Sequence, residues 1–202
     1  MKPISLTTFV NFAIKAHGTS RISYIKQARK QYESGYTPEA DFYKRLREAI
    51  VDMHRNGNPK SVLDPFIGTI THTKKVVLFT KCVSEYKKWM GNKSFTWINF
   101  RNETITVGKL PITLNPELGL EIDGDRSLIK LHLLKEEPSK YRTDVILHLM
   151  SKMGPCKENN PLGPCILDVQ RGRLVRPINI YPDIETLLLG EADMFIRLWN
   201  GV

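Results

Sequence analysis

The spacing of apolar residues changes near residue 95, and this change limits the possible folds more than any other feature of the sequence. Before it, apolar residues recur every three or four positions, as at Leu46, Ile50 and Met53, which is the spacing along one face of an α-helix. After it, apolar residues recur at every second position, as over residues 118–123, which is typical of a β-strand with one buried face. The sequence therefore predicts an α+β protein, helical in its first third and sheet-bearing afterwards.

The first 58 residues predict three helices. Thr7 or Thr8 can cap the first helix, because a hydroxyl side chain accepts a hydrogen bond from a free N–H of the first turn. The third helix is expected to start at Thr37-Pro38-Glu39, where a capping hydroxyl is followed by proline and then by an acid. Residues 1–58 are thus a basic, helical N-terminal segment. It forms either a separate domain or one compact unit with the rest of the chain.

The remaining residues predict a connector and a sheet-bearing core. Residues 59–72 form the connector, because Asp64-Pro65 favours a turn. Residues 73–202 are expected to form an α/β core with the element order α-β-β-β-α-β, a mixed sheet and a C-terminal helix. The clearest feature of this core is a hairpin joined through Asp123-Gly124, a dipeptide that is preferred in type I′ turns.

One face of this hairpin carries side chains that could perform chemistry. A two-residue turn places Glu121 opposite Arg126 and sends alternate residues to opposite faces, so that one face is wholly apolar. The other face carries the candidate catalytic residues Glu121, Asp123, Lys130 and His132. Carboxylates can hold a divalent metal, lysine can stabilise negative charge, and histidine can act as an acid or a base. Charge pairs on an exposed sheet explain the same pattern without any site, and we favour that interpretation.

Positive charge is concentrated in the N-terminal half of the chain. Residues 1–110 contain 19 Lys and Arg against 8 Asp and Glu, which gives them a net charge of +11. Residues 111–202 contain 11 against 13, a net charge of −2, so the whole chain carries +9. Such a distribution indicates a surface that faces a polyanion, most commonly DNA or RNA, although lysines also serve solubility alone. The second helix is expected to open at Ser20 or Ser23 and to stop at Gly35, and the fourth is expected from about Thr73 to Met90, where an apolar stripe at helical spacing is closed by Gly91. These two helices supply the candidate nucleic-acid-binding residues Arg21, Lys26, Arg29, Lys30, Lys74, Lys75, Lys81, Lys87 and Lys88.

The element order from residue 73 to 175 resembles that of the restriction-endonuclease-like superfamily, and the hairpin loosely resembles the region that carries the PD-(D/E)XK motif of RecB-type nucleases. The resemblance covers about half the chain. In that family an aspartate at the end of one strand and an acid-x-Lys on the next strand hold magnesium beside the scissile phosphate. The resemblance assigns Asp123 to the first position and makes it a tentative metal ligand. Lys130-Leu131-His132 stands where acid-x-Lys is expected, which implies an inactivated nuclease core that binds rather than cleaves.

Three functions follow from these observations. The first is a nucleic-acid-associated binding protein without catalysis or cofactor. The second is a protein–protein interaction module or accessory subunit, whose lysines serve solubility. The third is a metal-dependent nuclease or other hydrolase, with Mg²⁺ as its cofactor. The sequence shows neither a secretory signal nor an apolar run long enough to span a bilayer, and its three cysteines are an odd number, so a cytoplasmic protein with free thiols and no membrane partner is expected.

Overall fold

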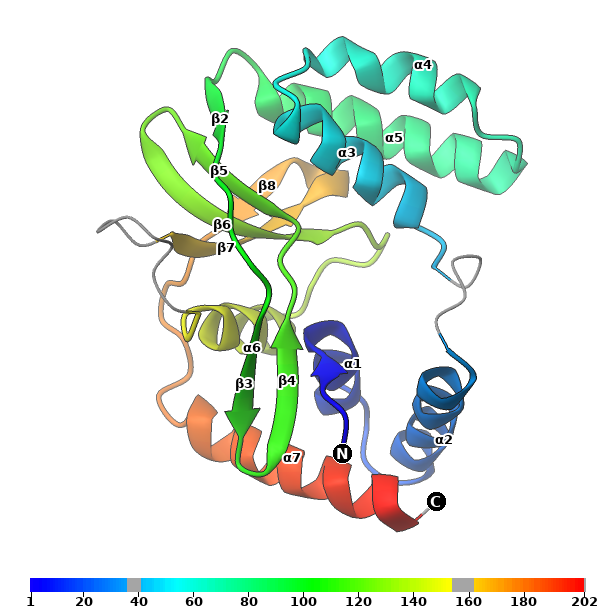
Figure 1. The fold of residues 1–202 in the computed structure, drawn as a ribbon, viewed down its shortest axis with the longest axis vertical. Coiled ribbons are helices and arrows are strands. Elements are labelled where there is room, and N and C mark those ends of the chain that lie inside the picture. The colour runs from blue at the N-terminus through cyan, green and yellow to red at the C-terminus, as the bar shows by residue number, and fades with distance from the viewer. Residues whose placement is uncertain (36–40, 154–161, 202) are drawn as a thin grey trace.

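The structure, a computed structural model, describes residues 1–35, 41–153 and 162–201 (Figure 1). It is α+β with mixed sheets and a C-terminal helix, as the sequence predicts. Its helices are α1 (Leu6–Ala13), α2 (Thr19–Ser34), α3 (Lys44–Arg55), η2 (Lys60–Val62, a 3-10 helix), α4 (Leu63–Gly68), α5 (Thr73–Met90), α6 (Lys140–Met150), η3 (Val169–Arg171, also 3-10) and α7 (Ile184–Gly201). Its strands are β1 (Ile4–Ser5), β2 (Phe95–Trp97), β3 (Glu103–Val107), β4 (Leu110–Leu114), β5 (Leu118–Ile122), β6 (Asp125–His132), β7 (Gly163–Asp168) and β8 (Arg173–Val175).

A five-stranded sheet in the order β2-β5-β6-β7-β8 organises the molecule. Strands β6 and β7 are parallel and the other neighbouring pairs are antiparallel. The parallel pair arises because α6 lies between its two strands in the sequence and carries the chain back across the sheet. Glu121 pairs with Arg126 and Ile122 with Asp125, so the predicted hairpin register is confirmed.

The sheet separates two apolar cores, because its strands send alternate residues to opposite faces. Leu118, Leu120 and Ile129 pack in one core with α3, α4 and α5. Leu128 and Ile166 point the other way and pack in the second core with α1, α6 and α7. Figure 1 shows the corresponding arrangement, with α3, α4 and α5 on one side of the sheet and α1, α6 and α7 on the other.

A second sheet of three strands, in the order β1-β4-β3, was not predicted. The sequence suggested that the strands following the fourth helix belong to one sheet. Instead, β3 and β4 form a separate hairpin, and β1 joins it in parallel through Ile4 opposite Ile112. Ile4 and Ile112 are both buried in the core that contains α1 and α7. This pairing joins residues about a hundred positions apart, which local sequence patterns do not reveal.

The cap of the first predicted helix differs in the structure, and the predicted start of the third falls on residues that the structure does not describe. Ser5, rather than Thr7 or Thr8, caps α1, since its hydroxyl accepts from the Thr8 N–H at 3.1 Å. Helix α3 begins at Lys44, after a turn in which the Asp41 carboxylate accepts from the Tyr43 N–H, whereas the predicted Thr37-Pro38-Glu39 start lies outside the described residues.

The predicted connector contains a helix, α4. Asp64-Pro65 was interpreted as a turn, but the structure places both residues in the first turn of this helix. Proline is tolerated there because the first N–H groups of a helix have no intrahelical acceptor.

A buried histidine links α3 to α5 and makes the stability of the fold depend on pH. His54 Nε2 lies 2.6 Å from the Tyr86 hydroxyl, and burial lowers the pKa of His54 from 6.5 to about 4. Between pH 6.5 and about pH 4, His54 is protonated in the unfolded chain but neutral in the folded protein. Stability is therefore lost as the pH falls through this window.

Acidification from pH 7 to pH 4 is therefore expected to cost roughly 3 kcal/mol through His54 alone. Urea unfolding of the wild-type protein and of His54→Gln at several pH values measures this contribution. Glutamine can still bond to Tyr86 but does not titrate, so the variant is expected to lose less stability in acid. Parallel stability–pH curves for the two proteins would show that His54 titrates normally in the folded state.

Candidate functional site

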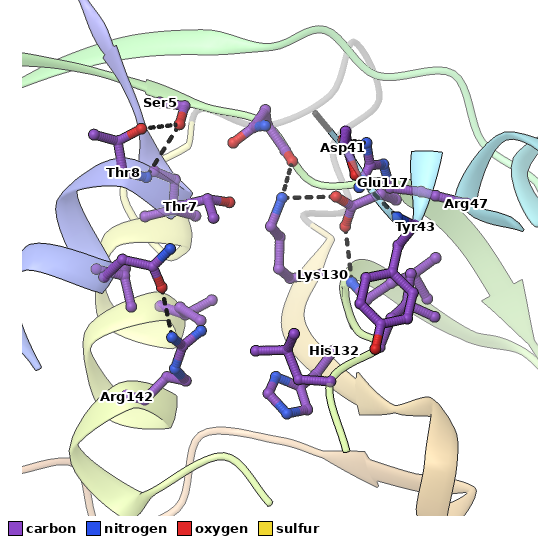
Figure 2. Close-up of a pocket in the computed structure, with 18 of the residues that line it drawn as sticks. Ser5, Thr7, Thr8, Asp41, Tyr43, Arg47, Glu117, Lys130, His132 and Arg142 are labelled. Carbon is purple, nitrogen blue, oxygen red and sulfur yellow. Dashed lines mark hydrogen bonds and ion pairs between the residues drawn. The ribbon is translucent and has the colours of Figure 1, made fainter. Parts of the chain in front are cut away.

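A pocket of about 820 Å³ opens beside the end of the β5–β6 hairpin (Figure 2). Helices α1 and α2 line one part of it, and residues 41–43, 115 and 117 line another. Its lining includes the charged residues Asp41, Arg47, Glu117, Lys130 and Arg142, together with His132. Helix α6 contributes Arg142, and β6 contributes Lys130 and His132. Segments that lie far apart in the sequence thus converge on one concave, mixed-charge surface.

The hairpin register explains why Glu117 and Lys130 meet. Leu118 pairs with Ile129, so the next pair outward brings Glu117 opposite Lys130. The Lys130 ammonium donates to Glu117 Oε1 and to the Asn115 carbonyl oxygen, both at 2.7 Å. Glu117 Oε2 accepts from the Leu131 N–H at 2.8 Å. Because the two side chains are only 9% and 10% exposed, this is a nearly buried ion pair with both carboxylate oxygens engaged.

His132 lies two residues beyond Lys130 and therefore on the same face of β6. Its Nε2 donates to the Glu136 carbonyl oxygen at 2.7 Å, which leaves Nδ1 as the acceptor nitrogen. Burial is the main cause that lowers the pKa of His132 below its ordinary value. The ring is consequently neutral at pH 7 and adds no charge to the pocket.

Arg142 brings a positive charge that the pocket does not balance. Ser139 caps α6 and fixes its first turn, from which the Arg142 side chain reaches the pocket. Its Nη2 donates to the Asn11 amide oxygen at 2.5 Å, and among the described residues no carboxylate contacts it. Burial lowers the pKa of Arg142, but a guanidinium remains charged near neutral pH. Asp41 is bound by Arg47 at 2.5 Å and Glu117 by Lys130, so one positive charge remains in excess.

The four residues predicted as catalytic do not form one site. They lie on one face of the hairpin, but Lys130 and His132 line the pocket whereas Glu121 and Asp123 lie toward the turn. Glu121 pairs with Arg126, which is four residues from Lys130 along β6, or about 13 Å. Asp123, the tentative metal ligand, has φ 51° in the turn and accepts from the Ser94 N–H at 2.8 Å. Within the described ranges, no three histidine, cysteine or carboxylate side chains are grouped so that they could hold a metal.

The predicted nucleic-acid-binding residues of α2 differ in their environments. Arg21 was expected to face solvent, but it is 3% exposed and its guanidinium binds both carboxylate oxygens of Glu191. Arg29 is partly exposed and forms an ion pair with Glu33. Lys26 and Lys30 are exposed, and Lys26 lies about 200° around the helix from the pocket-lining Tyr24. Arg21 is therefore a structural residue, and the exposed lysines of α2 point away from the pocket.

The predicted residues of α5 form a second basic group. Lys74, Lys81 and Lys88 are exposed. Lys87 is half-buried and contacts Asp64 at 2.6 Å, and the Lys75 ammonium lies 4.9 Å from the centre of the Phe42 ring. Figure 1 shows α5 and α2 toward opposite ends of the long axis of the molecule. The nine predicted residues therefore do not form one continuous surface.

Sequence reasoning missed Glu117, Arg142, Asn11 and the other pocket residues outside the hairpin. A signal for Glu117 was present, because the register that sets Glu121 opposite Arg126 also sets Glu117 opposite Lys130. No comparable signal exists for Asn11 and Arg142, which are 131 positions apart.

Comparisons with known proteins assign the chain to no family. No protein-family model matches the chain, and no curated protein matches it significantly. No helix in the described part of the chain combines the length and the apolar character needed to cross a membrane.

Proposed function

We propose that the protein binds nucleic acid and that its nuclease-like core serves as a binding scaffold rather than a cleaving one. The observation that carries this proposal is Arg142, a charged side chain in a pocket whose two carboxylates, Asp41 and Glu117, are already engaged by other cations. Phosphate is a suitable ligand for such a guanidinium, because its oxygens match the planar, forked N–H groups of arginine.

The sheet supports the nuclease-like part of the proposal. Leaving out the β3–β4 hairpin, which joins the second sheet, the order is α5, β2, β5, β6, α6 and β7. The first three of these strands are antiparallel neighbours, and β7 adds in parallel after the α6 crossover. This is the α-β-β-β-α-β order on which the resemblance to the restriction-endonuclease-like superfamily rests.

The pocket favours binding over cleavage. In the resembled family an aspartate and an acid on the next strand hold magnesium, whereas in this pocket the carboxylate of Glu117 directs its two oxygens to Lys130 and to the Leu131 N–H. Lys130 in turn is held by Glu117 and by the Asn115 carbonyl oxygen, so its charge is already compensated. Glu117 and Lys130 therefore satisfy each other's charge within this side of the pocket. Arg142 remains the charged group of the pocket that can bind an anion.

The proposal is tested by titrating the protein against fluorescently labelled single-stranded DNA, duplex DNA and RNA at increasing salt concentration. Binding is expected at low salt, with an affinity that falls linearly on a double-logarithmic plot because each phosphate contact releases counterions. Absence of binding at low salt, or an affinity indifferent to salt, contradicts the proposal. Cleavage of any of these substrates in the presence of Mg²⁺ contradicts the non-cleaving part and favours a metal-dependent hydrolase.

A further inference from the structure

We infer that the pocket accommodates one unpaired nucleotide of a single strand, with its phosphate at Arg142 and its base toward Tyr43. This inference rests on the proposed nucleic-acid binding and adds to it the form of nucleic acid that the protein selects. Exposed lysines bind single and double strands alike, whereas a pocket of limited size distinguishes between them.

The size of the pocket limits which form of nucleic acid can enter it. A volume of about 820 Å³ lies in the range of sites that enclose a single small ligand. Duplex DNA is too wide to enter, since its major groove alone is roughly 12 Å across. A nucleotide of a paired strand reaches such a pocket only after unstacking and unpairing, which costs free energy, whereas a nucleotide in an overhang or a loop has already lost its partner.

The charges of the pocket orient the nucleotide. Figure 2 shows Arg142, Thr7 and Thr8 on one side, and Asp41, Glu117, Arg47 and Tyr43 on the other. A phosphate is repelled by the carboxylates of Asp41 and Glu117 and attracted by the uncompensated guanidinium of Arg142. The phosphate is therefore placed on the α1 and α6 side.

Aromatic and amide side chains line the pocket and can contact a base. Phe42 and Tyr43 both line it, with ring centres 5.0 Å apart, and an unpaired base can stack on such rings. Gln27 and Gln31 line it from α2, and their amides can both donate to and accept from the edge of a base. Stacking and amide contacts of this kind are typical of single-strand recognition.

The test compares a blunt, fully paired DNA duplex of two strands with the same duplex extended by a short single-stranded overhang. Wild-type protein is expected to bind the overhang form more tightly. Arg142→Gln is expected to weaken binding of the overhang form by roughly tenfold or more, because it removes a hydrogen bond between charged groups. Binding of the blunt form is expected to stay unchanged. Arg101→Gln, at an exposed position that does not line the pocket, is the matched control and is expected to behave as wild type.

A pair of variants at Tyr43 tests the base side. Tyr43→Phe keeps the ring and is expected to retain the preference for the overhang, whereas Tyr43→Leu is expected to reduce it. Melting temperatures of all variants establish that each is folded before its affinity is compared.

The outcomes separate this inference from the proposed function. Equal affinity of the wild-type protein for both duplexes, or an Arg142→Gln variant that binds both equally more weakly, overturns the single-nucleotide pocket but leaves nucleic-acid binding intact. No binding of either duplex at low salt overturns the proposed function itself. Competition by a free nucleoside monophosphate at the pocket, without any binding of the overhang, also overturns the assignment to a strand.

Discussion

Glu117→Ala is expected to lower the free energy of unfolding by about 3–5 kcal/mol, because it leaves the nearly buried Lys130 ammonium without its counter-charge. The substitution also removes the acceptor of the Leu131 N–H. Urea denaturation followed by tryptophan fluorescence measures the loss, provided that the slope of the transition is unchanged.

Two variants control for other causes of this loss. The double variant Glu117→Gln with Lys130→Met removes both charges together and is expected to recover much of the stability. Glu137→Ala breaks the ion pair between Glu137 and Arg173, in which the two side chains are 52% and 55% exposed. It is expected to lower the free energy of unfolding by at most about 1 kcal/mol. If Glu117→Ala lowers the free energy of unfolding no more than Glu137→Ala does, the Glu117–Lys130 pair is solvated and is not a buried ion pair of the pocket.

Arg21→Gln is expected to destabilise the fold by roughly 3 kcal/mol, because the nearly buried ion pair of Arg21 with Glu191 joins α2 to α7. Its guanidinium contacts both Glu191 oxygens at 2.7 and 3.0 Å and donates to the carbonyl oxygen of Ala13 at 3.2 Å. It also lies 4.9 Å from the centre of the Phe12 ring. Glutamine is too short to reproduce this set of contacts.

Lys26→Gln is the matched control for Arg21→Gln, since it removes a positive charge from an exposed position of the same helix. It is expected to leave stability unchanged within about 0.5 kcal/mol. The affinity of the folded Arg21→Gln protein for nucleic acid is expected to match that of the wild type. A stable Arg21→Gln variant with weakened nucleic-acid binding would restore the surface role that the sequence suggested.

Local patterns predicted much of the fold because they depend on neighbouring residues. Helix α5 occupies Thr73–Met90, and the sequence predicted the same bounds from a helical stripe closed by glycine. The Asp123-Gly124 turn fixed the hairpin register, and that register determines which side chains of β6 face the pocket. Both results follow from residues that lie within about one element of each other.

Long-range contacts account for what the sequence did not predict. The pairing of β1 with β4, the burial of Arg21 against Glu191, and the contact of Asn11 with Arg142 each join distant segments. An arginine looks the same in the sequence whether it faces water or a buried carboxylate. The site was therefore assigned to the hairpin alone, where Lys130 and His132 were found but their neighbours from α1 and α6 were not.

Arg142 is the residue through which the pocket is proposed to contact phosphate. The most direct test is the slope of log affinity against log salt concentration for single-stranded DNA, measured for the wild-type protein and for Arg142→Gln. The variant is expected to bind more weakly and to show a slope shallower by about one, since one phosphate contact is lost. Identical slopes and affinities in the two proteins would contradict this role of Arg142.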